Sequence, residues 1–305
     1  MVDVTASAFG FRVQSSYPLQ FLRAGGGAAT LHVAPISERP LSLEEPPLVE
    51  WASGNGKGDV WARLYRSSHG FQFSTTGGMS CHIDPATRTI GIIDEGEECS
   101  WEAGLWGLPA LLCFMHSGDF PLHAAAVEID GGAVLLSAPG RCGKTTLALA
   151  FHRHGYRVLS EDLACCRLSD HPVLLPGPTL LRMRPDGLNG DSPIGTRVVL
   201  AREDRIYMAL NSDRAGTGDP VPIRAIVFLR ESPNEVRLEP IRWQDAVPDL
   251  WALSFRLPDR PALARCLGQV ICLARTVPVW NLYRPIEFAS LGPTIAKIVE
   301  MCRHT

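Results

Sequence analysis

One stretch decides how the chain is interpreted: Ser137-Ala138-Pro139-Gly140-Arg141-Cys142-Gly143-Lys144-Thr145-Thr146. From Gly143 onward it matches the Walker A pattern, although Ala138 replaces the usual first glycine. A short apolar run at 133–137 precedes it, and a helical pattern at 145–154 follows, with Gly155 placed to end the helix. Strand, loop and helix in this order predict a phosphate-binding loop.

The chemistry of such a loop requires each of these residue types. Small residues let successive backbone N–H groups turn inward around an anion, and the start of the helix adds its positive dipole. We expect Lys144 to reach the β- and γ-phosphates of ATP and the hydroxyl of Thr145 to bind Mg²⁺. Alanine is tolerable at 138 if that position needs no positive φ. The predicted nucleotide-binding residues are Ala138, Pro139, Gly140, Arg141, Cys142, Gly143, Lys144, Thr145 and Thr146.

An acidic pair follows the next predicted strand, 156–160. Glu161 and Asp162 are placed at its carboxyl end, where side chains beside a phosphate loop face the phosphates. Because neighbouring strand residues point to opposite faces, we do not expect both to point straight into the site. We favour Asp162 as the Mg²⁺ ligand or general base, with Glu161 as the second candidate. His123 begins the strand that pairs back onto the loop strand, and its spacing alone favours a structural role.

The rest of the chain divides into two predicted regions. Residues 1–100 read as a β-rich N-terminal region whose short strands alternate with turn-prone segments, which favours an antiparallel meander. Residues 101–305 mix strands and helices around the loop, which predicts an α/β nucleotide-binding domain. The glycine-rich stretch 54–58 carries a lysine but precedes a strand pattern, so it is predicted to be a plain loop. The expected strands are 60–66, 71–75, 79–84, 89–94, 123–130, 133–137, 156–160, 224–229 and 277–283, and the expected helices are 101–117, 145–154, 261–274 and 293–303.

Composition excludes several classes of partner. A formal net charge of −3 gives no electrostatic reason to expect a nucleic acid or a membrane surface. The longest apolar run, Leu105–Met115, is interrupted by Pro109 and is too short to span a bilayer. There is no secretory signal pattern, and the nine cysteines include no CxxC pair, so a cytoplasmic location with reduced thiols is expected. The adjacent Cys165 and Cys166 are predicted to be buried thiols rather than metal ligands.

Three segments together resemble the catalytic domain of HPr kinase/phosphorylase. They are Leu122–Val127, Val134–Thr146 and Gly155–Asp162, in the family's order and at its approximate spacing. The resemblance implies a mixed-sheet P-loop kinase core, with His123 near the phosphates. It also implies that Glu161 and Asp162 stand at the positions of the family's paired aspartates. Glu161 departs from the first of these aspartates.

A second, looser resemblance is to HPr-kinase-related peptide kinases, including those that phosphorylate a serine of lasso-peptide precursors. It implies a peptide or protein substrate that bears a serine, with Asp162, Glu161, His123 and Lys144 in the catalytic site. Two alternatives stay open: a kinase for a small serine-like alcohol, and a non-catalytic module that senses a nucleotide. A homo-oligomer also stays open. Three arginines are candidates for a further cation at the phosphates: Arg182, Arg184 and Arg205.

Overall fold

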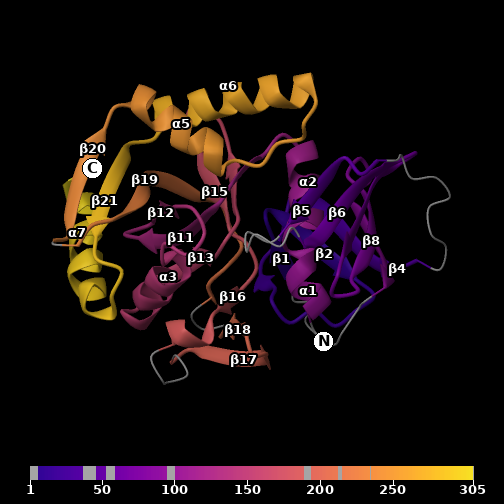
Figure 1. Ribbon diagram of the computed structural model, residues 1–305, viewed down its shortest axis with the longest axis horizontal. Coiled ribbons are helices and arrows are strands. Elements are labelled where there is room, and N and C mark those ends of the chain that lie inside the picture. Colours follow the sequence, from indigo (N-terminus) through magenta and orange to yellow (C-terminus); the bar gives the residue numbers. More distant parts are fainter. Residues whose placement is uncertain are drawn as a thin grey trace.

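The computed structural model describes residues 6–36, 46–52, 59–94, 100–188, 194–211, 215–233 and 235–304. These residues form a mixed α/β architecture with three sheets. Figure 1 shows the first sheet at the right in indigo and purple, the second at the left in magenta to yellow, and a small third sheet below them. No helix in the described ranges is both long and apolar enough to span a membrane. The predicted loop at 54–58 lies outside those ranges.

The first sheet is formed by the N-terminal strands in the order β3-β1-β2-β4-β9-β8-β7-β6-β5. The antiparallel meander is confirmed for β6 to β9, whose neighbours pair through short turns. It is wrong for the other half, because β2 pairs with β4 and β4 with β9 in parallel. Two strands in a parallel pair need a crossover connection between them. For β2 and β4 this connection includes β3, which pairs with β1 at the edge of the sheet. The strands are β1 (Ala6–Ala8), β2 (Phe11–Ser15), β3 (Arg23–Ala24), β4 (Ala29–Pro35), β5 (Val49–Ala52), β6 (Val60–Ser67), β7 (Gly70–Thr75), β8 (Ser80–Asp84) and β9 (Thr89–Asp94).

The single helix predicted over 101–117 is two helices, α1 (Ser100–Leu105) and α2 (Leu108–His116). The break falls at Gly107, whose N–H donates to the carbonyl of Gly104. Both helices pack in the core of the first sheet, with Trp106 and Phe114 buried. The ring of Phe114 lies 5.3 Å from that of Phe9. These helices belong to the second predicted region, but they pack against strands of the first. The division of the chain at residue 100 stays a prediction.

The second sheet carries the predicted loop strand at its centre. A tight turn joins β11 (Ala124–Ile129) to β12 (Gly132–Ser137), and Asp130 and Gly131 both have positive φ, as a type I′ hairpin requires. On its other side, β12 pairs in parallel with β19 (Val221–Glu231), which in turn pairs in parallel with β21 (Val279–Arg284). The carboxyl ends of these three parallel strands therefore meet at one edge of the sheet.

The remaining elements include the predicted helices and several strands that the sequence pattern missed. The helices α3 (Lys144–Arg153), α6 (Arg260–Thr276) and α7 (Leu291–His304) lie where they are predicted, as does β13 (Arg157–Ser160). The elements outside the expected ranges are β10 (Phe120–Leu122), β14 (Ala164–Arg167), β15 (Val173–Leu175), β16 (Leu180–Met183), β17 (Thr196–Ala201), β18 (Ile206–Leu210), β20 (Arg237–Ile241) and α5 (Trp243–Leu253). Cys165 and Cys166 on β14 are buried, as predicted.

A buried arginine joins the first sheet to the second. Arg23 on β3 is 1% exposed, and its guanidinium donates to the backbone carbonyls of Gly177, Ala215, Val158 and Leu159. Burial, aided by the nearby charge of Arg157, lowers the pKa of Arg23 to about 9, so the group stays charged at neutral pH. Since β13 contributes two of these carbonyls, the strand that leads to Glu161 is held from the N-terminal side of the molecule.

We expect Arg23→Met to lower the free energy of unfolding by about 2–5 kcal/mol, because it removes a charged donor from four buried backbone carbonyls. Arg12→Met is the matched control, since the side chain of Arg12, on β2 of the same sheet, is exposed and donates only to Thr30 among described residues. The control is expected to cost less than about 0.5 kcal/mol. Urea unfolding of the variants measures both values, and equal effects would show that Arg23 does not fasten the two sheets together.

Candidate active site

The loop at residues 138–143 leaves β12 and enters α3 as the sequence predicts. Gly143 has φ +77°, which favours glycine, and an added Cβ would lie 2.5 Å from a nitrogen of Arg284. Ala138 is buried and is not among the described residues with positive φ, so its methyl group is tolerated. The backbone N–H groups of 140–143 donate to no described residue, so they are available to an anion.

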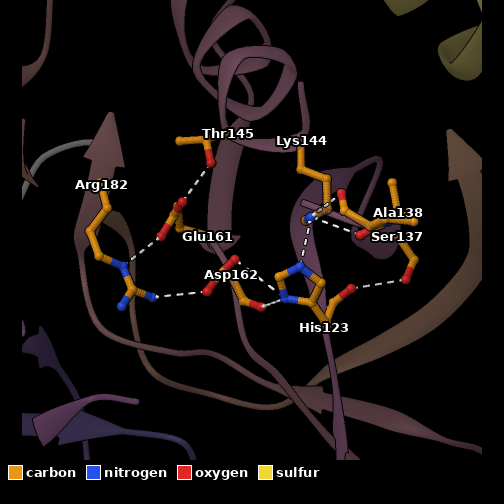
Figure 2. Close-up of polar contacts among 9 residues, drawn as sticks. His123, Ser137, Ala138, Lys144, Thr145, Glu161, Asp162 and Arg182 are labelled. Carbon is orange, nitrogen blue, oxygen red and sulfur yellow. Dashed lines mark hydrogen bonds and ion pairs between the residues drawn. The ribbon is translucent and has the colours of Figure 1, made fainter. Parts of the chain in front are cut away.

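The ammonium group of Lys144 is buried at the start of α3. Its Nζ donates to the carbonyls of Ala138 and Pro139 at 2.8 and 3.1 Å, so the loop curls around it. It also lies 2.8 Å from Nε2 of His123 (Figure 2). Burial lowers the pKa of Lys144, and the carboxylates of Asp162 and Glu161 partly offset that effect.

The contact with Lys144 fixes the protonation of His123. Because an ammonium group can only donate, Nε2 of the imidazole accepts, and the ring proton is on Nδ1. Nδ1 lies 3.1 Å from the backbone oxygen of Asp162 and 3.3 Å from its carboxylate. Burial lowers the pKa of His123, the carboxylate of Asp162 raises it and Lys144 lowers it again, with a net decrease. His123 is therefore neutral at physiological pH.

The two carboxylates of the acidic pair join one cluster. Glu161 is buried and accepts a hydrogen bond of 2.5 Å from the hydroxyl of Thr145, whereas Asp162 faces His123. The expectation that only one of them points into the site is wrong. Strand β13 ends at Ser160, so the alternation of a strand does not extend to these two residues.

Arg182, which lies on β16, binds both carboxylates. Its guanidinium donates to Glu161 at 3.1 Å and to Asp162 at 3.4 Å. Burial raises the pKa of Glu161 despite Arg182. Burial also acts to raise the pKa of Asp162, but the neighbouring Arg182, His123 and Lys144 together outweigh it, so the pKa is lowered. Arg205 adds a smaller effect in the same direction on Asp162. Arg184 makes no contact with the pair among the described residues.

The oxygens of Thr145 and Glu161 fit a Mg²⁺ ion. No group of three or more His, Cys, Asp or Glu side chains in the described ranges could hold a metal by itself. Magnesium, however, is commonly bound through one or two protein oxygens together with phosphate oxygens and water. The hydroxyl of Thr145 and the carboxylate of Glu161 supply such a pair. Asp162, favoured from the sequence as the metal ligand, lies instead against His123 and Arg182.

The structure adds one residue that the sequence reasoning missed. Arg284, at the end of β21, is buried, and its Nη2 donates to the carbonyl of Cys142 in the loop at 3.2 Å. It follows a strand that was predicted at 277–283. An arginine at the carboxyl end of a parallel strand was the available signal, because such ends meet at the edge where ligands bind.

Comparison with known proteins adds little to this geometry. No protein-family model matches the chain. No curated protein matches it either. A solved structure of the Hpr(Ser) kinase/phosphatase from Coxiella burnetii is similar over 60% of this chain and 95% of that chain, with 12% sequence identity and a TM-score of 0.31. A likeness of this size supports no conclusion about activity.

We expect the imidazole of His123 to titrate below its ordinary pKa of about 6.5 and to titrate at higher pH in Lys144→Met, because that change removes a neighbouring positive charge. Histidine NMR signals followed against pH measure the difference, and Arg141→Met in the exposed part of the loop is the control. A pKa of His123 that does not rise in Lys144→Met would contradict the contact between the two side chains.

Proposed function

We propose that this chain is a Mg²⁺-dependent phosphotransferase that moves the γ-phosphoryl group of ATP to a serine hydroxyl of a peptide or protein. One observation carries the proposal: Lys144, His123, Thr145, Glu161 and Asp162 converge beside the N-terminus of α3. The cation, the metal-binding oxygens and an acceptor-side carboxylate are the parts that phosphoryl transfer needs. The choice of a serine on a peptide rests on the sequence resemblance.

The donor side of the site would be formed by the loop and Lys144. The N–H groups of 140–143 and the start of α3 would bind the β- and γ-phosphates. Lys144 would exchange its contacts with the loop carbonyls for phosphate oxygens, which carry more negative charge. Thr145 and Glu161 would hold Mg²⁺, whose charge offsets the negative charge that builds up between the β- and γ-phosphates.

Asp162 would serve the acceptor side. Its lowered pKa keeps the carboxylate ionised at neutral pH, so that it can accept a hydrogen bond from the serine hydroxyl. As the serine oxygen bonds to the γ-phosphorus, the bond to the β-phosphate oxygen breaks, ADP leaves and the hydroxyl proton passes to Asp162. A weak base suffices because the transition state of phosphoryl transfer is loose and the hydroxyl loses its proton late. His123 and Arg182 hold the carboxylate in place.

The test is transfer of label from γ-labelled ATP in the presence of Mg²⁺ to serine-containing peptides, with free serine in parallel. Asp162→Asn is expected to lower turnover by about 10²–10⁴-fold while leaving ATP binding intact. Lys144→Met is expected to remove transfer and to weaken ATP binding as well. Asp245→Asn is the matched control, because Asp245 is exposed and pairs with Arg242 at the start of α5.

Three results would contradict parts of this proposal. A chain that binds ATP but labels no acceptor would be a nucleotide-sensing module. Label on free serine alone would identify a small-molecule kinase. Full turnover in Asp162→Asn would remove that residue from the chemistry.

A Mg²⁺ titration separates the two carboxylates. Glu161→Gln is expected to raise the Mg²⁺ concentration at half-maximal turnover by about 10- to 100-fold, since it removes a charged oxygen beside Thr145. In Asp162→Asn that concentration is expected to stay within about 2-fold of wild type, although turnover falls. The reverse pattern would exchange the two roles.

A further inference from the structure

A cavity of about 520 Å³ lies outside the cluster just described, where β21 ends and α7 begins. Its wall is formed by the segment after β21, the outer face of the first turns of α7 and the segment before β20. The segment after β21 contributes Pro285 and Ser290, α7 contributes Ala296, and the segment before β20 contributes Val236. The volume falls within the range of cavities that hold small organic ligands.

The topology places this cavity at the same edge of the sheet as the loop. Strands β12, β19 and β21 are parallel, so the loop at 138–143, Ser232 and Pro285 follow three carboxyl ends that lie side by side. Strand β20 runs antiparallel to β21, so the residues before it, Glu235 and Val236, reach that edge too. Ligands of open α/β sheets bind outside such carboxyl ends.

Arg284 lies between the loop and the cavity. One of its terminal nitrogens donates to Cys142 in the loop and the other to Pro285 in the cavity wall, each at 3.2 Å. A single guanidinium group therefore separates the two features. The side chain is 3% exposed, and its buried Nε has no hydrogen-bond partner among the described residues. A buried guanidinium nitrogen without an acceptor fits a site for anionic oxygens.

The wall of the cavity has the chemistry of a nucleoside site. Val236, Pro285 and Ala296 provide apolar surface for a flat base. Next to them, Ile286 and Phe288 are 47% and 41% exposed, which is unusual for large apolar side chains. The carboxylates of Glu235, Glu287 and Glu300 also line the cavity and can accept hydrogen bonds from ribose hydroxyls.

We infer that this cavity binds the base and ribose of the nucleotide whose phosphates bind at the 138–143 loop. Arg284 then lies beside the α-phosphate, at the point where the nucleotide extends from the loop to the cavity. The ligand class is a nucleoside triphosphate. This inference rests on the proposed function for the phosphate site. It adds the segments 235–236 and 285–300 to the donor site, which no sequence motif indicates.

The experiment compares two ligands in the presence of Mg²⁺, ATP and inorganic tripolyphosphate, by titration calorimetry. Ala296→Trp places a large side chain in the cavity from the exposed face of α7. We expect it to weaken ATP binding by about 10- to 100-fold and to leave tripolyphosphate binding within about 2-fold, because only ATP carries a nucleoside. Ala264→Trp, on the exposed face of α6, is the matched control and is expected to change neither.

A second variant, Ala289→Trp, fills the cavity from the segment before α7 and is expected to give the same selective loss. Unchanged ATP binding in both filled variants, or an equal loss of both ligands in both, would overturn the inference. Tripolyphosphate binding by wild type separates the two proposals. If wild type binds neither ligand, the phosphate site itself fails. If it binds both and the filled variants bind ATP normally, only the nucleoside cavity fails.

Discussion

The ammonium group of Lys144 can be buried at the edge of the second sheet only because a neutral imidazole and two loop carbonyls accept its protons. That constraint determines the tautomer of His123, whose remaining proton must then face Asp162. Asp162 is in turn shared with Arg182, which also holds Glu161 against Thr145. One buried charge thus sets the orientation of the side chain just before β11, of the two just after β13, and of those it reaches on β16 and α3.

The sequence pattern predicts the positions of the loop and of the strand and helix beside it, but not which side chains meet around Lys144. A strand, a small-residue loop and a helix are local patterns, so β12, the loop and α3 lie at their predicted positions. The expectation for the acidic pair failed because it assumed that the alternation of β13 continues past Ser160. The end of a strand cannot be predicted from sequence to within one residue. Arg182 was one of three arginines that composition could not separate, since only its contacts with Glu161 and Asp162 in the folded chain distinguish it.

Other parts of the fold depend on pairings between distant segments, which no local pattern encodes. The parallel pairs β2–β4 and β4–β9 interrupt a series of short strands that reads as a simple meander. Arg284 lies far along the chain from the loop and meets Cys142 only because β12, β19 and β21 are adjacent. Two different guanidinium groups therefore belong to this region, one paired with Glu161 and Asp162 and the other in contact with the loop. Arg182 is neutralised by carboxylates, whereas the side chain of Arg284 donates, within the described part of the chain, to backbone carbonyls only.

The contacts of Arg23 also constrain the order of events during synthesis. This residue leaves the ribosome before its carbonyl partners, which lie 135 to 192 positions further along the chain. Until those segments have been made, the guanidinium has to stay in water, and the first sheet has to wait with one edge open. Contacts of such long range slow folding and prolong the exposure of unpaired strands. The Arg23 contacts can therefore be completed only after residue 215 has been made.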